Sequence, residues 1–426
     1  MTLFNKKANC DDHIDRISDL PSNVIDGILE HLNIRDLVRT SILSRKWRYM
    51  WISFPRLKFD KEFFDLYDAE DFEDHGPEVS RIITEILFIH NGPIYKFALS
   101  IPCGFNITVG YLIKWILFLS RNGVKQIQLE SKSRNYRMPS YLFFCQELTH
   151  VRICNFNLSV PPNFGGFKSL LHLHLENITF GIGALECIVS GSSLLEELWI
   201  VGCSGYESVD LIAPTLKVFR IEYGHVIKLI CLEKAKNLID FTLILYKDGV
   251  FGSNKILPEI QRLTMGLSSK MLYADIIHPS QLISLKYLKL NGVNLDERGE
   301  LLYIVSVLKN ASNMVEFVLE TDFDQYSKTQ LPDRGEELEC SNGCLSQLLS
   351  VNIKLRTNFK HAMSLIRFIL ANSSSLKTLT LDLHLGYNKS DLPILFSISR
   401  DLLWMDRASP RAHIDFTHRY SEYPYG

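Results

Sequence analysis

A short apolar pattern recurs along most of this 426-residue chain and limits the folds that the chain can adopt. Three apolar residues stand at the first, fourth and sixth positions of each copy, as in Leu195–Ile200, LEELWI. Successive copies begin about 26 residues apart on average. The twelve copies start at Ile94, Val124, Leu148, Leu170, Leu195, Leu216, Leu238, Ile260, Leu285, Met314, Leu348 and Leu376. Repeated units that each bury only one apolar face must stack side by side, so the spacing predicts a solenoid.

Helical stretches that end in glycine or polar residues separate several copies. Such residues after the last apolar turn are helix stop signals. The expected helices are Tyr111–Leu119, Ala184–Val189, Leu301–Leu308 and Ala362–Leu370. The series resembles the leucine-rich repeat family over roughly residues 94 to 390. This resemblance implies a curved solenoid of the α/β class, with a parallel sheet on the concave side and helices on the convex side.

Before the repeats, residues 19–51 are predicted to form three short helices. Pro21 suits the first turn of the first helix, and Asn33 is a plausible stop. Asp36 opens the second helix, and Ser44 can cap a third that carries Trp47. Three short helices cannot bury a core of their own well, so many of their apolar side chains must be covered by a partner or by the rest of the chain.

Residues 16–56 resemble the F-box. The matching residues are Leu20, Pro21, Val24, Ile25, Ile28, Leu29, Leu32, Asp36, Leu37, Val38, Ser41, Leu43, Ser44, Arg45, Trp47, Arg48 and Trp51. In that family the helices dock onto a Skp-type adaptor, which joins them to a cullin scaffold. By position, the resemblance implies adaptor binding through Leu20, Pro21, Ile28, Leu29, Leu37, Val38 and Trp47, at or just behind the contact. The alternative is an ordinary helical cap for the following domain.

The end of the chain contains the stretch Arg407–Ala412, RASPRA, after an expected helix Lys360–Leu370 and strand Leu376–Leu383. This order resembles the FBD domain at the C-terminus of many plant F-box and leucine-rich repeat proteins. Physically, we expect a terminal repeat plus a cap that closes the end of the solenoid.

These patterns predict an N-terminal three-helix F-box, a curved leucine-rich repeat solenoid and a C-terminal FBD-type cap. The expected boundaries are 1–15 for an N-terminal tail, 16–56 for the F-box, 57–93 for a linker and acidic loop, 94–339 for the repeats, 340–416 for the FBD-like region and 417–426 for a tail. The acidic run Asp65–Glu78 is expected to be a solvated loop.

No membrane or secretion signal is expected. The most apolar window, Val109–Leu119, is far shorter than the roughly 20 apolar residues of a membrane span and is predicted to be a core helix. The first residues lack the apolar stretch of a signal peptide. We therefore expect a protein of the cytoplasm, the nucleus or both.

Motifs that carry chemistry are absent from the sequence. There is no phosphate loop, no H-E-x-x-H and no G-x-S-x-G; the stretch Gly202–Gly205, GCSG, lacks the required spacing and falls where a turn is expected. His172 and His174 point the same way on one strand, but no third metal ligand is identifiable. Of the nine cysteines, only Cys340 and Cys344 lie close together, so free thiols are expected. We predict no catalytic residues, no metal and no cofactor.

The balance of charged residues limits the kinds of partner that the chain can bind. Lys and Arg number 46 and Asp and Glu number 48, a net charge of −2. This balance argues against nucleic-acid binding that relies on phosphate neutralisation.

One residue of each repeat is expected to point out of the concave sheet, between the last two apolar positions. This column is Ala98, Gln128, Arg152, His174, Trp199, Arg220, Thr242, Thr264, Lys289, Val318, Asn352 and Thr380. Trp199 stands beside His174 and Arg220, with Arg152 one strand further. Tryptophan and arginine are enriched at interface hot spots, so these four residues are predicted to bind a target protein. Alternatively, a loop or a chain terminus covers Trp199.

The family resemblance implies the substrate-recognition subunit of a Skp–cullin–F-box ubiquitin ligase, with the target held by the solenoid and ubiquitin chemistry performed by partners. The alternative is a leucine-rich repeat binding scaffold without a role in ubiquitin transfer. Expected partners are the adaptor, through it a cullin, and an unidentified target protein; no nucleic acid or membrane is expected.

Overall fold

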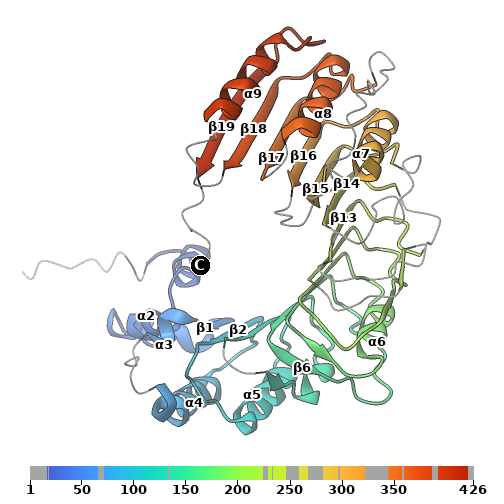
Figure 1. The fold of residues 1–426 in the computed structure, drawn as a ribbon. Coiled ribbons are helices and arrows are strands. Elements are labelled where there is room, and N and C mark those ends of the chain that lie inside the picture. Colours follow the sequence, from blue (N-terminus) through green and yellow to red (C-terminus); the bar gives the residue numbers. More distant parts are fainter. Residues whose placement is uncertain are drawn as a thin grey trace, which may run out of the picture. The chain divides into compact units, whose positions relative to one another are not determined.

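The computed structural model describes most of the chain, and contacts divide it into two compact units, residues 1–148 and 149–426. The described residues are Ile17, 19–65, 72–132, 135–223, 229–232, 234–245, 259–266, 282–295, 298–321, 344–356, 359–385 and 392–420. Each unit combines helices with parallel strands (Figure 1).

The first unit joins a helical segment to a small parallel sheet in which β1 pairs with β2 and β2 with β3. Its elements, with η for 3₁₀ turns, are α1 (Ser22–Glu30), α2 (Ile34–Arg39), η1 (Thr40–Ile42), η2 (Trp47–Tyr49), η3 (Trp51–Ser53), β1 (Arg56–Phe59), α3 (Lys61–Phe64), α4 (Phe72–Ile89), β2 (Lys96–Ile101), α5 (Val109–Arg121), β3 (Gln126–Ser131), β4 (Tyr136–Arg137) and η4 (Ser140–Phe144). The segment expected to be a linker therefore carries β1, α3 and α4.

The second helix begins earlier than the sequence predicts. The first helix ends at Glu30, before the stop expected at Asn33, and Asn33 is instead the N-cap of α2, because its side chain accepts a hydrogen bond from the Asp36 backbone N–H at 2.9 Å. A capped N-terminus satisfies a backbone donor that the helix itself leaves unpaired. The helix therefore starts at Ile34 rather than at Asp36.

The third predicted helix is wrong as an α-helix, because the chain forms the short 3₁₀ turns η2 and η3 instead. Ser44 does accept a hydrogen bond from the Trp47 N–H at 3.3 Å, as a capping residue does. The following Met50 N–H bonds to the Trp47 carbonyl, a spacing of three residues. Pro55 then forces Phe54 into an extended conformation, which ends the helical stretch.

The expectation of a loop over Asp65–Glu78 is wrong for its second part, because α4 begins at Phe72. Acidic residues are favourable near a helix N-terminus, where the macrodipole is positive. Residues 66–71 of the run lie outside the described residues. The helix is anchored by Val79, Ile83 and Leu87, which recur every four residues and are buried.

The second unit is a long parallel sheet with helices beside it. Its elements are β5 (His150–Cys154), β6 (Phe156–Leu158), β7 (His172–Glu176), β8 (Thr179–Phe180), α6 (Ala184–Gly191), β9 (Glu197–Val201), β10 (Ser208–Asp210), β11 (Val218–Glu222), β12 (Leu229–Cys231), β13 (Asp240–Ile244), β14 (Arg262–Gly266), β15 (Tyr287–Val293), α7 (Arg298–Asn310), β16 (Glu316–Thr321), β17 (Ser350–Leu355), α8 (Phe359–Asn372), β18 (Thr378–Leu385), α9 (Leu392–Trp404) and β19 (His413–Tyr420). Figure 1 shows the sheet strands following one another along an arc, with α6 and α7 on its outer side.

The twelve copies of the apolar pattern are confirmed as strands. Each strand begins two residues after the first apolar residue of its copy, as β9 at Glu197 follows Leu195. The four expected helices are confirmed as α5, α6, α7 and α8. Within each copy the last two apolar residues point inward, and in β9 Leu198 and Ile200 are fully buried. The core of the solenoid thus lies between the sheet and the outer segments.

A residue with a positive φ angle follows each of four successive strands. These residues are Asn155 (61°), Asn177 (51°), Gly202 (63°) and Tyr223 (55°). The backbone N–H of each then donates to the end of the next strand, as from Gly202 to the Glu222 carbonyl at 2.8 Å. Glycine and asparagine adopt this conformation at low cost, so they suit the turn that leads the chain off the sheet.

The Arg407–Ala412 stretch leads into one further strand. Ser409 is buried and donates its hydroxyl hydrogen to the Leu376 carbonyl at 2.8 Å, and the Ala408 N–H bonds to the Leu370 carbonyl at 2.9 Å. The chain then forms β19, which pairs parallel to β18. Arg407–Ala412 therefore forms the turn that leads into the strand of a last repeat.

Among the described residues, no helix combines the length and the apolar character needed to cross a bilayer.

Candidate functional site

The four predicted concave residues lie side by side in one row of the sheet. The strand register pairs Arg152 with His174, His174 with Trp199, and Trp199 with Arg220. The same row continues through Thr242 on β13. The two-residue period of a strand therefore placed these side chains on one face, as the sequence predicts.

Trp199 is held in a stack of planar groups. The His174 ring lies parallel to it, with ring centroids 4.3 Å apart and an interplanar angle of 10°. The Arg220 guanidinium carbon lies 4.6 Å from the Trp199 ring centroid. Neighbouring strands are about 4.8 Å apart, so planar side chains at paired positions stack directly. Since His174 and Arg220 come from strands on opposite sides of β9, they cover the two faces of the indole.

This stack corrects the expectation of an exposed tryptophan. Trp199 is half-buried, and among the described residues His174 and Arg220 stack on its ring. Its indole N–H is buried and has no hydrogen-bond partner among the described residues. The ring therefore shares the row with two basic side chains that stack on it, His174 and Arg220.

Carboxylates fix the basic side chains of the row. Arg220 Nε lies 3.1 Å from Glu222 Oε1, and an Arg152 terminal nitrogen lies 3.7 Å from Glu176 Oε2. Glu197 approaches His174 Nε2 at 3.4 Å. These pairs reduce the net positive charge of the site, while they hold the guanidinium groups in defined positions.

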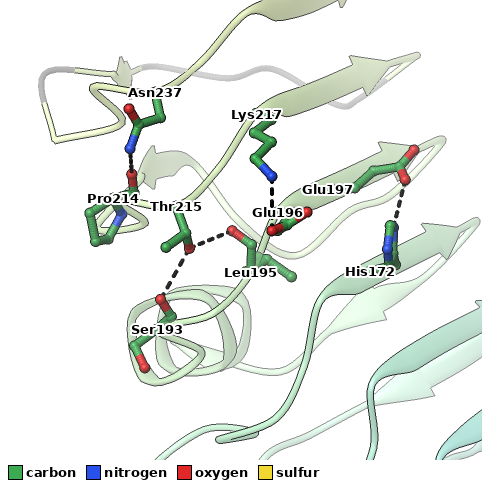
Figure 2. A network of polar contacts seen from close by, with 9 residues as sticks. All are labelled: His172, Ser193, Leu195, Glu196, Glu197, Pro214, Thr215, Lys217 and Asn237. Atoms are coloured by element: carbon green, nitrogen blue, oxygen red, sulfur yellow. Dashed lines mark hydrogen bonds and ion pairs between the residues drawn. The ribbon is translucent and has the colours of Figure 1, made fainter.

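His172 adds a further contact to the same carboxylate. Its Nδ1 lies 2.7 Å from Glu197 Oε2 (Figure 2), and its ring stacks on His150 with centroids 4.4 Å apart. Burial lowers the pKa of His174 from its ordinary value, and the nearby Arg152 lowers it further, while Glu197 opposes both. The site therefore combines fixed arginines with a histidine that resists protonation.

A second stacked arginine lies further along the concave face. The Arg262 guanidinium carbon lies 4.0 Å from the Tyr287 ring centroid, and its Nε is 3.4 Å from an Asp240 oxygen. Burial raises the pKa of Asp240, although Arg262 and Arg220 oppose this shift. Sequence reasoning missed Arg262 because it considered only one outward-pointing residue of each strand, which on β14 is Thr264. Arg262 stands two residues before Thr264 and therefore points to the same face. Tyr287 occupies the equivalent position on the next strand, so comparing this position between repeats would have found the pair.

Side chains beside the row tie successive repeats together (Figure 2). The Asn237 amide donates to the Pro214 carbonyl at 2.7 Å, and the Thr215 hydroxyl donates to the Leu195 carbonyl at 2.9 Å. Lys217 and Glu196 form an ion pair of 2.9 Å. These contacts join the turns that precede the strands, so they support the backbone that positions the stack.

The helical segment of the first unit places its seven predicted residues at different depths. Leu29, Leu37 and Trp47 are buried in the unit itself. Leu20 and Val38 are half-buried, and only Pro21 and Ile28 are exposed.

Other exposed apolar residues of the helical segment were outside the seven predicted for adaptor binding, although Val24 and Leu43 were among the F-box matches. Ile42 is 84% exposed and Tyr49 is 64% exposed. The remaining members are Val24 and Leu43. With Ile28, these five residues define the apolar surface of the helical segment. Their signal in the sequence was the excess of apolar residues over what three short helices can bury.

Among the described residues, no group of three His, Cys, Asp or Glu side chains could hold a metal ion. Gly202–Gly205 follows β9 as a bent segment in which Ser204 forms a β-bridge with Thr179, and Cys203 within it is buried. Burial raises the pKa of the Cys203 thiol to about 12, so it stays protonated and a poor nucleophile. Cys340 lies outside the described residues.

Comparisons with known proteins match both units. The F-box domain model matches residues 17–59, the model of the LRR repeats of FBD-associated F-box protein At5g56370 matches residues 112–256, and the model of the At1g61320/AtMIF1 LRR domain matches residues 195–400. The Arabidopsis thaliana F-box/FBD/LRR-repeat protein At1g13570 is 30% identical, over 94% of this chain and 98% of its own length. The Arabidopsis F-box/LRR-repeat protein At3g26922 is 28% identical, over 60% of this chain and 90% of its own length.

Proposed function

The chain belongs to the F-box/FBD/LRR-repeat protein family, and we propose from this premise that it is the substrate-recognition subunit of a Skp–cullin–F-box ubiquitin ligase. The helical segment binds the Skp-type adaptor and, through it, a cullin. The repeats bind the target protein. Proteins of this family are in general adaptor or receptor subunits rather than catalysts, and ubiquitin transfer falls to the partners.

The observation that carries this proposal is the apolar surface of the helical segment. Ile42, Tyr49 and their neighbours are large apolar side chains that water contacts in the isolated chain. Several large exposed apolar side chains on one short segment favour a binding site, because exposing them to water is unfavourable. Leu29, Leu37 and Trp47 of the same segment are buried in the unit. An exposed apolar surface on a segment that also has buried side chains fits the adaptor contact of an F-box.

Co-expression of the full chain with a Skp-type adaptor tests the proposal. We expect the adaptor to co-purify in a one-to-one complex, and a cullin to join it when added. If the folded chain retains no adaptor, the proposal is wrong, and the chain is a repeat-based binding scaffold without a role in ubiquitin transfer.

We further propose that the target contacts the concave row of Arg152, His174, Trp199 and Arg220. Arg220 lies over the indole ring and pairs with Glu222 through Nε, which leaves its two terminal nitrogens for a target. Two parallel N–H groups match a carboxylate or phosphate group. This geometry supports a target segment that places an acidic or phosphorylated side chain beside the indole edge.

A further inference from the structure

Arg262 is held on the concave face in the same way as Arg220. Each guanidinium lies over an aromatic ring of a neighbouring strand, with its carbon 4.0 Å from the Tyr287 centroid for Arg262 and 4.6 Å from the Trp199 centroid for Arg220. In both arginines Nε lies within 3.4 Å of a carboxylate oxygen. Among the described residues neither arginine has another acidic partner, so the two terminal nitrogens of each remain for an anion.

Lys289 adds a positive charge next to Arg262. It lies on β15, two residues after Tyr287 and therefore on the same face, and its strand register pairs it with Thr264 of β14. One strand spacing and two residues separate the Cα atoms of Arg262 and Lys289, a distance of about 8 Å. Two long side chains can meet at one anion over that distance. No carboxylate in the described part of the chain pairs with Lys289, so it supplies the charge that Asp240 removes from Arg262.

Arg220 and Lys289 belong to one row of the sheet. The row runs from β11 through Thr242 on β13 and Thr264 on β14 to β15. Three strand spacings of about 4.8 Å place the Cα atoms of Arg220 and Lys289 about 14 Å apart, and the same geometry places Arg262 about 12 Å from Arg220. Two groups of positive charge thus lie on this face, separated by the short side chains of the two threonines.

The separation of these two groups matches a short stretch of extended peptide. Such a peptide advances about 3.3 Å per residue, so a span of about 12–14 Å corresponds to four residues. Side chains four positions apart in an extended chain point to the same side. A peptide that crosses the strands along the row can therefore present two acidic groups to the sheet at once. Joined groups bind more tightly than separate ones, because the second contact forms within an existing complex.

We propose that Arg262 and Lys289 form a second anion-binding subsite, and that the target is an acidic peptide segment with two acidic groups four residues apart. One carboxylate or phosphate group pairs with the terminal nitrogens of Arg220, and the other lies between Arg262 and Lys289. Arginine binds such groups through two parallel N–H groups, while lysine contributes a point charge. This inference rests on the proposed target site around Trp199 and adds the second contact and the spacing that select the target.

Fluorescence anisotropy of the full chain with labelled synthetic peptides tests the spacing. The first probe carries two phosphoserines four residues apart in an otherwise uncharged sequence, and the second probe carries them at adjacent positions. We expect the first probe to bind at least tenfold more tightly, although the two peptides have the same net charge. Equal affinities overturn the proposal, because charge alone would then account for binding, and so does the absence of binding by both probes.

A matched pair of peptides with glutamate in place of phosphoserine identifies the acidic group. Glutamates four residues apart that bind as tightly as the phosphoserines indicate a target that carries carboxylates. Weaker binding with the same preference for spacing indicates a phosphorylated target, and both results support the second subsite.

Substitutions test the residues of the second subsite. Arg262→Gln and Lys289→Gln should each weaken binding of the first probe at least fivefold and reduce its advantage over the second probe. Lys354→Gln is the matched control, because it removes one charge from the same face two strands beyond β15. Thermal melting checks that the variants are folded. Wild-type affinity in both Arg262→Gln and Lys289→Gln overturns the proposal.

Arg220→Gln distinguishes a failure of this inference from a failure of the proposed function. If Arg220→Gln weakens peptide binding while Arg262→Gln and Lys289→Gln do not, the target site around Trp199 stands and the second subsite is wrong. Co-purification with the adaptor depends on none of these residues, so its failure would overturn the ligase role alone.

Discussion

Trp199 forms the centre of the concave row, between His174 and Arg220. Because the indole is half-buried, Trp199→Ala should lower the free energy of unfolding by about 1–3 kcal/mol, less than the roughly 3–5 kcal/mol of a fully buried tryptophan. At the centre of an interface the same change should cost at least about 2 kcal/mol of target affinity, some thirtyfold. Denaturant unfolding and target titration measure the two effects separately.

Thr264→Ala is a suitable control, since Thr264 occupies the same column three strands away. Unchanged target affinity in Trp199→Ala would show that the concave row is not the target site.

His174 makes stability depend on pH. Burial lowers its pKa below the ordinary value of 6.5, so the folded chain disfavours the charged ring. The unfolded chain binds the proton more readily than the folded chain. The stability that the neutral His174 ring contributes is therefore complete above pH 6.5 and is lost as the pH falls below that value. We expect the free energy of unfolding to fall less between pH 7 and pH 5 in His174→Gln than in the wild type.

The exposed His413 supplies the control, because His413→Gln removes a histidine outside the stack. Identical pH profiles for the wild type and His174→Gln would remove His174 as the source of the dependence.

Gly202 occupies a position that side chains rarely tolerate. Its φ angle is +63°, and a Cβ atom there would lie 2.3 Å from Asn177 Oδ1. Gly202→Ala should destabilise the chain by about 1–3 kcal/mol, since strain at positive φ adds to the contact with Asn177. Gly110→Ala, in α5, meets nothing within 4 Å and should be nearly neutral. Thermal melting of the two variants compares them, and equal melting temperatures would contradict this account of the turn.

At the scale of elements, the strands were predictable because three apolar positions in six residues occur in every repeat. β1 was not, since Leu57 and Phe59 form only part of the pattern. The third helix of the first segment failed for a different reason. Spacing favoured an α-helix, but the chain forms the two 3₁₀ turns η2 and η3, and Pro55 then holds Phe54 extended and ends the stretch. Residue spacing predicted the row around Trp199, whereas the stacking that covers the indole depends on neighbouring strands and could not be read from one repeat.

The C-terminal elements protect the apolar interior of the repeats. Inward residues of β16, such as Phe317 and Leu319, are fully buried in the complete chain, where β17 pairs with that strand. Truncation after residue 340 removes β17 and everything beyond it, so it should open this cross-section to water and cause aggregation or partial unfolding. Light scattering and thermal melting measure the outcome. A soluble fragment that melts cooperatively would show that the C-terminal region is an appended module.

At the scale of the whole molecule, the account assigns separate tasks to the two units. The apolar surface of the helical segment serves the adaptor, and the concave row serves the target. Each surface rests on buried side chains of its own unit, Trp47 in the first and Leu198 in the second. Substitutions in one surface should therefore leave binding at the other unchanged.

Titration of the purified chain with a Skp-type adaptor tests the central claim most directly. Replacing Leu20 and Pro21 by alanine should cost a few kcal/mol of affinity, and Ile42→Asp should abolish binding, because it places a charge in the apolar contact. Phe144→Asp is the matched control, an exposed aromatic residue of the same unit outside the helical segment. The account predicts tight binding by the wild type and the control and none by Ile42→Asp. Equal affinity for all four proteins, or no binding by the folded wild type, would contradict it.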